Sequence, residues 1–200
     1  MDYLANPPNS AKVYFAKEEF ERCGFPKNPS DLEVFLMRNL VFNILNPIRI
    51  ALGAPVSIND CYRTVEKYKY MISSGSYNPS ATSDHFWAQA IPLSDPLLRA
   101  RYGTDYVFSV GAVDFHVPSI QDILPVFNKI ISMDRSGTIG VGQCIIEAAY
   151  DTEGKMTKQW IHISNPRSLV YSQSFIKDFG ISKTKYLASN DNGKTYQAVA

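Results

Sequence analysis

Residues 30–53, SDLEVFLMRNLVFNILNPIRIALG, restrict the fold more than any other part of the sequence. Ser30 is a suitable N-cap, and Gly53 is a natural end for a helix. Apolar residues recur between them at near-helical spacing, at Leu32, Phe35, Leu36, Leu40, Phe42 and Leu45. We therefore expect a long amphipathic helix with a kink or break near Pro47, whose apolar face must be buried against a second layer.

Several segments rich in β-branched and aromatic residues predict the strands of that second layer. They are PVSIND (55–60), YVFSVGAVDFHV (106–117), VGQCIIEAAYD (141–151) and KQWIHIS (158–164). Further helices are expected at 62–75 and at 119–133, the latter with Ser119 as its cap, and a hairpin turn is expected at 151–157. The order of elements indicates an α+β fold in which N-terminal helices pack on a small, mostly antiparallel sheet.

The chain divides by composition into residues 1–170 and residues 171–200. The first part carries the periodic segments and is expected to form a single domain. The second part is more polar and contains the turn signal Asn192-Gly193, so we expect it to form a C-terminal extension or arm, either a hairpin or a loose segment.

Charge and hydropathy exclude several classes of partner. The 20 basic and 19 acidic residues leave a formal charge of +1, so neither nucleic acid nor an anionic membrane is expected as a partner. No segment approaches the roughly 20 apolar residues of a spanning helix, and the first residues, MDYLANPPNS, lack the features of a signal peptide. We therefore expect the chain to be cytoplasmic in the cell that produces it.

The three cysteines, Cys23, Cys61 and Cys144, show no CxxC spacing and no neighbouring histidine. We expect buried free thiols rather than disulfides or a thiolate metal site. Cys61 lies in the segment INDCYR, but the sequence shows no base or helix N-terminus that would activate it. We therefore expect it to be structural.

A carboxylate and two histidines are the candidates for a metal site. Asp114 lies among Ala, Val and Phe, where a carboxylate is costly to bury unless a cation or several donors compensate it. His162 shares a strand face with Trp160 and Ser164, and His85 follows a polar, Ser/Thr-rich loop. Two imidazoles and one carboxylate with an open fourth position form a typical catalytic zinc set. The alternative is a hydrogen-bonded strand aspartate and structural histidines.

Six short motifs occur in one order along residues 15–165. They are N-P-I-R (46–49), G-A-P-V-S-I with Y-R (53–58 and 62–63), S-x-H (83–85), A-x-D-F (112–115), Q-x-I-I-E (143–147) and W-I-H-I-S (160–164). In this order they resemble the zinc D-alanyl-D-alanine carboxypeptidases and their phage relatives, which cut cell-wall peptides. The alternative is an unrelated α+β domain in which the matches are coincidental.

The resemblance implies a role for each matching residue. His85, Asp114 and His162 would hold Zn²⁺, and Arg63 would bind an oxygen of the substrate or of the transition state. Arginine suits that role because its guanidinium keeps its charge and presents a fork of donors. A structural salt bridge is the alternative for Arg63, and the resemblance gives His116 no role. The implied fold is the α+β fold of DD-peptidases and hedgehog-like domains, and the implied partner is a peptidoglycan peptide.

The sequence departs from the family pattern at two positions. The family carries its metal-binding aspartate seven residues after the histidine, where this chain has Pro92, so Asp114 would serve only after an insertion. The family's acidic proton shuttle stands three residues before the last histidine, where this chain has Gln159. Glu147 could replace that shuttle, and Glu153 is a weaker candidate. If neither serves, Gln159→Glu should raise the activity.

Two functions remain open at this point. The first is an active zinc peptidase of a phage, released at lysis or carried in the virion. The second is a catalytically inactive peptidase fold that acts as a structural or binding component of a phage particle, with other virion proteins as partners. Because Gln159 cannot transfer protons, weak or absent cleavage of cell-wall peptides is expected unless Glu147 supplies the carboxylate.

Overall fold

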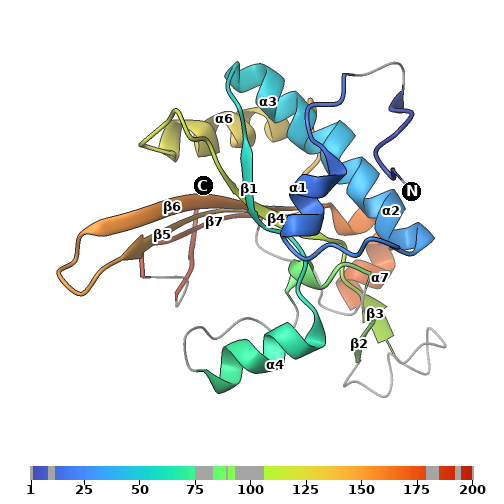
Figure 1. Cartoon of the computed structure of the whole chain (residues 1–200). Helices are drawn as coiled ribbons and strands as arrows, with labels where there is room; N and C mark the ends of the chain where they lie inside the picture. The colour runs from blue at the N-terminus through green and yellow to red at the C-terminus, as the bar shows by residue number, and fades with distance from the viewer. Residues whose placement is uncertain are drawn as a thin grey trace.

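The structure, a computed structural model, describes residues 2–8, 12–74, 83–88, 90–92, 106–178, 185–191 and 195–199. Its centre is a six-stranded sheet with the order β1-β4-β6-β5-β7-β8 (Figure 1). The strands are β1 Ser57–Asp60, β4 Ala112–His116, β5 Cys144–Tyr150, β6 Met156–Ser164, β7 Tyr186–Ser189 and β8 Gln197–Ala198. Neighbours are antiparallel except β5 and β7, which are parallel. This confirms the expected mixed fold with a mostly antiparallel sheet.

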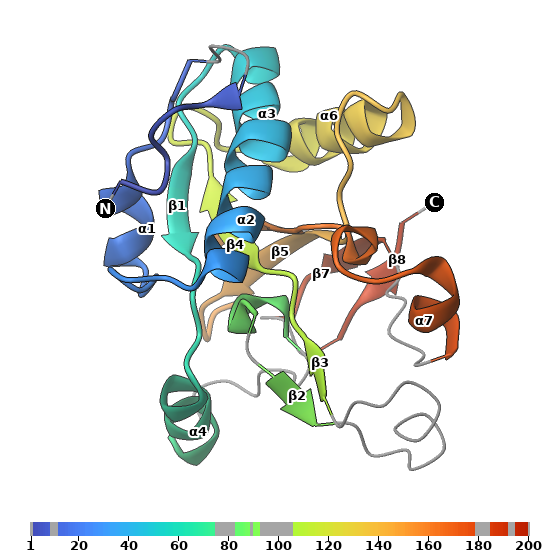
Figure 2. The same cartoon turned by 90° about the vertical axis from the view of Figure 1, so that its right-hand side faces the viewer.

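The two faces of this sheet are covered differently. The α-helices are α1 Lys17–Arg22, α2 Asp31–Asn39, α3 Asn46–Leu52, α4 Val65–Ser73, α6 Leu124–Arg135 and α7 Gln173–Asp178. Helices α2, α3 and α6 lie over one face, whereas α4 lies on the other side, together with a separate pair of strands, β2 Ala90–Pro92 and β3 Tyr106–Phe108 (Figures 1 and 2). No helix in the described ranges is long and apolar enough to cross a membrane.

The long N-terminal helix begins and ends where the sequence predicts. Ser30 Oγ accepts a hydrogen bond from the backbone N–H of Glu33, and the Glu33 carboxylate accepts one from the backbone N–H of Ser30. Gly53 ends α3 in the left-handed conformation, with a φ of 60°. Between α2 and α3 the chain does not break but widens into a π-helical segment, Leu40–Leu45. This widening immediately precedes Pro47, whose ring cannot fit against a regular preceding turn.

Helix α6 begins later than predicted. The expectation that Ser119 caps this helix is wrong, because α6 starts at Leu124. A helix starting at Ser119 would place Pro125 in its interior, where the ring removes a hydrogen bond and clashes with the preceding turn. Starting at Leu124 places Pro125 in the first turn, where proline is tolerated. The Asp122 side chain accepts a hydrogen bond from the backbone N–H of Leu124.

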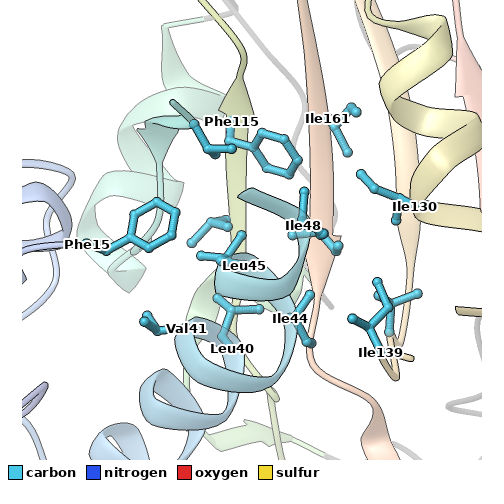
Figure 3. Packing of buried hydrophobic residues seen from close by; sticks show 14 of the residues in the cluster. Phe15, Leu40, Val41, Ile44, Leu45, Ile48, Phe115, Ile130, Ile139 and Ile161 are labelled. Atoms are coloured by element: carbon cyan, nitrogen blue, oxygen red, sulfur yellow. The ribbon is translucent and has the colours of Figure 1, made fainter. Parts of the chain in front are cut away.

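The hydrophobic core occupies one face of the sheet, and the other face can carry a functional site. Fully buried side chains from the three central strands face the helices, namely Val113, Phe115, Cys144, Ile161 and Ile163. Ile44 and Ile48 of the long helix and Ile130 of α6 pack over them (Figure 3). Because side chains alternate along a strand, Asp114 and His162 must point to the opposite face. That is the face on which α4 lies.

Strands β7 and β8 come from residues 171–200, the part expected to form an extension or arm. β7 pairs with β5, and β8 pairs with β7, so this part of the chain extends the main sheet at the end opposite β1. The turn signal Asn192-Gly193 lies outside the described residues, as do residues 93–105 of the expected insertion.

Candidate metal centre

Asp114 and His162 are direct partners in the register of β4 and β6. His85 lies next to both of them, in the short 3₁₀ turn Asp84–Phe86. His85 Nε2 lies 3.1 Å from Asp114 Oδ1 and 3.1 Å from His162 Nδ1. His162 Nδ1 lies 2.9 Å from Asp114 Oδ1. The structure therefore brings the three expected ligands together on one face of the sheet.

The three atoms are spaced for a tetrahedral metal ion. Ligands about 2.0–2.1 Å from zinc in tetrahedral geometry stand about 3.3 Å from one another. The distances of 2.9 to 3.1 Å between the ligand atoms fall a few tenths of an ångström short of that spacing. A small outward rotation of the side chains would seat an ion on all three and leave a fourth position open. The group His85, Asp114 and His162 can therefore hold a metal.

The protonation of His85 is set by a backbone carbonyl. His85 Nδ1 lies 2.9 Å from the carbonyl oxygen of Cys61, which can only accept a hydrogen bond. In the neutral imidazole, Nδ1 therefore carries the proton, and the lone pair of Nε2 points at Asp114 and His162. Carbonyl partners of this kind orient metal-binding histidines in general. Cys61 thus contributes to the site through its main chain, while its thiol stays buried.

A strained turn after His85 holds the histidine against the sheet. Trp87 and Ala88 both have positive φ angles, 34° and 51°, which residues other than glycine rarely adopt. Trp87 Nε1 donates to the Cys61 carbonyl at 2.8 Å, and the Trp87 ring lies over Gly111. A Cβ atom on Gly111 would stand 2.5 Å from that ring, so the close approach requires glycine. The sequence offered no signal for the role of Trp87.

Burial and the histidines set the charge of Asp114. Burial alone would raise the pKa of Asp114, but the charges and hydrogen bonds of His85 and His162 outweigh it and hold that pKa well below its ordinary range. Burial would lower the pKa of His85, but the charge and hydrogen bond of Asp114 outweigh it and raise the pKa. An ionised carboxylate enclosed by two imidazoles is a site in which a cation replaces protons.

The insertion between His85 and Asp114 is closed on itself. β2 and β3 pair from Ala90↔Phe108 to Pro92↔Tyr106, so both ends of the insertion lie side by side. The backbone N–H of Ala88 donates to the carbonyl of Ser109 at 2.8 Å, which returns the chain to β4. Pro92 belongs to this separate pair of strands, whereas Asp114 lies in the ligand group. A closed insertion of this kind costs little stability.

Arg63 lies against the turn that carries His85. Its backbone N–H donates to the His85 carbonyl at 2.8 Å, and Nη1 donates to Ser83 Oγ at 2.9 Å. Nη2 lies 3.6 Å from Asp60 Oδ2, and the side chain is buried. These contacts correspond to the structural alternative for Arg63. A substrate role would require the guanidinium to turn toward the open side of the cluster.

Glu147 lies on the same sheet face as the ligands. It pairs with Trp160, while His162 pairs with Ile145, so Glu147 lies two residue pairs along the sheet from His162 and on the same face. Burial and the charge of Asp114 raise the pKa of Glu147, and the charge of His162 acts in the opposite direction. A buried carboxylate on the ligand face whose pKa is raised holds its proton more readily than an exposed glutamate, which is a property of general acids.

Gln159 points away from the ligands. It pairs with Ala148 and lies on the helix-covered face, where its Oε1 accepts a hydrogen bond from the backbone N–H of Ile123 at 3.1 Å. Glu153 is exposed in the β5–β6 turn, at the far end of the hairpin from His162. Among the carboxylates considered from the sequence as proton shuttles, Glu147 is the one on the metal face of the sheet.

An open groove of about 860 Å³ runs from Asp114 along the ends of β1, β4 and β6. Trp160 and Lys158 line one side of it, and Asn59 and His116 line another. His116 Nδ1 lies 2.6 Å from Asn59 Oδ1, so His116 belongs to the groove and not to the ligand group. The groove gives an extended ligand access to the metal centre.

We compared the chain with known protein families, curated proteins and solved structures. The chain matches no protein-family model, no curated protein and no solved structure. The function of the site therefore has to be argued from its geometry and from the motifs in the sequence.

Proposed function

We propose that the chain is a zinc-dependent hydrolase of amide bonds in peptidoglycan peptides, with the DD-peptidase or hedgehog-like variety of α+β fold. The observation that carries the proposal is the convergence of His85 Nε2, Asp114 Oδ1 and His162 Nδ1 on the sheet face that also bears Glu147. Two imidazoles and a carboxylate with an open fourth position are a donor set of catalytic zinc. The substrate class comes from the resemblance to zinc D-alanyl-D-alanine carboxypeptidases.

Each residue of the site has a part in this chemistry. A bound zinc ion supplies a Lewis acid and lowers the pKa of a coordinated water. Glu147 would take a proton from the attacking water and deliver it to the leaving amine. The groove beside Asp114 would hold the peptide, with the ring of Trp160 as an apolar surface and Lys158 as a partner for a peptide carboxylate.

The test is cleavage of purified peptidoglycan by the wild-type chain. We expect about one zinc per chain by elemental analysis, and release of soluble peptide fragments that stops on chelation and returns when zinc is added. Restoration by zinc after chelation separates this chemistry from a contaminating hydrolase. A protein that takes up no zinc and releases no fragments would contradict the proposal.

A second candidate is the inactive peptidase fold acting as a component of a phage particle. It is favoured by the position of Gln159, which replaces the family's proton shuttle and is bonded to Ile123 on the other face of the sheet. It is also favoured by the contacts that hold Arg63 to Ser83 and Asp60. This candidate predicts zinc uptake without fragment release, so the same experiment distinguishes the two.

The substitution Gln159→Glu is expected to leave the rate of fragment release within about twofold of wild type, since proton transfer requires hydrogen-bond reach. The family pattern implies a different result, a rise in activity, if no other residue serves as the proton shuttle. The new carboxylate would remain on the helix-covered face and accept the same hydrogen bond from Ile123. An increase of tenfold or more, measured on equal amounts of zinc-loaded protein, would show that the side chain at 159 reaches the metal centre after all.

A further inference from the structure

A row of residues crosses the sheet beside the metal centre. Trp160 of β6, Glu147 of β5 and Ser189 of β7 are successive register partners. The next strand, β8, pairs Gln197 with Ala188, so the residue before it, Tyr196, stands beside Ser189. The row therefore connects the centre of the sheet with the last strand of the described chain.

Tyr196 reaches across this row to Glu147. Its hydroxyl donates a hydrogen bond of 2.9 Å to Glu147 Oε1. Ser189 stands between the two strands and is small, and its Oγ donates to Asp191 Oδ1 at 2.9 Å. A large side chain at Ser189 would fill the space through which the phenol passes. Glu147 is 6% exposed, whereas Tyr196 is 40% exposed, so Tyr196 enters from the surface to contact a buried carboxylate.

Thr195, the residue before Tyr196, is bonded to Asp191, which lies two residues after β7. Asp191 accepts hydrogen bonds from the backbone N–H and the side chain of Thr195, at 2.9 and 2.6 Å. Beyond Tyr196, the backbone N–H of Val199 donates to the carbonyl of Tyr186 at 3.0 Å. Tyr196 is therefore held on one side by Asp191 and on the other by Tyr186 of β7, which restricts the direction from which its hydroxyl approaches Glu147.

We propose that Tyr196 is a positioning residue for Glu147, an inference that rests on the proposed hydrolase function. The hydrogen bond to Oε1 restricts the rotation of the carboxylate and would leave Oε2 for proton exchange. Among the described residues, Glu147 lies within electrostatic range of Asp114, His162 and His85, so its orientation decides whether it exchanges a proton with the attacking water. The C-terminal segment thereby completes a site whose metal ligands all lie before residue 165.

The first test compares Tyr196→Phe with Gln197→Ala, a change at the adjacent exposed position of the same segment. In Tyr196→Phe we expect kcat for fragment release to fall about tenfold or more, as for other partners that orient reactive groups, with KM within about twofold and zinc content unchanged. Gln197→Ala should match wild type in all three. An unchanged kcat in Tyr196→Phe, or an equal loss in Gln197→Ala, would overturn the assignment.

The second test does not use activity. Urea unfolding of the metal-free protein is followed for wild type, Tyr196→Phe, Glu147→Ala and the double variant, which isolates the interaction of the two side chains. Tyr196→Phe should shift the urea midpoint in the wild-type background and leave it unchanged in the Glu147→Ala background. Additive shifts would overturn the contact even in an active enzyme. A wild-type chain that cleaves nothing would refute the proposed function and the positioning role together, whereas cleavage that Tyr196→Phe leaves unchanged would refute the role of Tyr196 alone.

Discussion

Replacement of His162 by alanine is expected to weaken zinc binding by at least about 100-fold, because even the partners that merely orient metal ligands contribute 10- to 100-fold. His162 Nδ1 lies 2.9 Å from Asp114 Oδ1 and 3.1 Å from His85 Nε2, so its removal leaves one imidazole and one carboxylate. Two ligands hold zinc poorly against water and buffer. Competition with a chromogenic chelator measures the affinity, and elemental analysis after dialysis measures the zinc that remains.

His116→Ala is the matched control for this loss. His116 lies two residues after Asp114 on the same strand face, and it contacts Asn59 and not the ligand group. The His116→Ala protein should retain about one zinc per chain. A ligand that binds only the folded state stabilises it by about 2.7 kcal/mol when the free ligand concentration is 100 times the dissociation constant. Added zinc should therefore raise the melting temperature of wild type and His116→Ala but not of His162→Ala. Equal zinc retention in all three proteins would contradict the ligand assignment.

The sheet face on which Asp114 and His162 lie could be predicted because it depends on local periodicity. Alternation in GAVDFHV and WIHIS places both polar side chains opposite the apolar residues that the long helix must cover. The same rule applies to Gln159, because three residues from His162 on a regular strand is the opposite face. In the structure the strand is regular at this point, and Gln159 lies on the helix-covered face with its Oε1 bonded to the backbone N–H of Ile123.

The contributions of Trp87 and Tyr196 could not be predicted in this way. Periodicity indicates which face of a strand is buried, but it does not say which distant strand lies alongside or in what register. The contact of Tyr196 with Glu147 depends on β7 pairing in parallel with β5 across a long stretch of chain. Trp87 depends on a sharp turn with two positive φ angles and on the space above Gly111. Neither depends on a pattern within one segment.

The insertion shows how tertiary structure brings together residues that lie far apart in the sequence. Pro92 stands where the peptidases that the motifs resemble carry an aspartate, which suggested a missing ligand. The β2–β3 hairpin brings Ala88 and Ser109 together, so the two sides of the motif are adjacent in space although they are separated in the chain. Hairpin closure of this kind depends on pairing between the two ends of the insertion, which composition does not reveal.

Replacement of Glu147 by glutamine is expected to reduce kcat for fragment release by about 100- to 10,000-fold, the range that general acid–base groups contribute. Glutamine has the same size and keeps an oxygen that can accept the hydrogen bond from Tyr196, but it cannot take up a proton from water. Zinc content should stay at the wild-type value, because Glu147 lies two residue pairs along the β5–β6 ladder from His162 and is not part of the ligand group. Kinetics on purified peptidoglycan with zinc-matched protein samples measure the loss.

Stability against pH distinguishes this catalytic loss from damage to the fold. Burial and the charge of Asp114 raise the pKa of Glu147 in the folded chain, so the folded state favours the protonated form. The folded protein then holds this proton more tightly than the unfolded chain does. The contribution of the proton to the free energy of unfolding is full at low pH, and it is lost as pH rises from about 4.3, the pKa of glutamate in the unfolded chain, through the raised pKa of the folded chain. Glutamine never ionises, so the Glu147→Gln protein should lack this decline and be at least as stable as wild type near neutral pH. A variant that is both inactive and less stable at neutral pH would mean that Glu147 supports the fold rather than the chemistry, and cleavage that survives the substitution would place the proton shuttle on another residue.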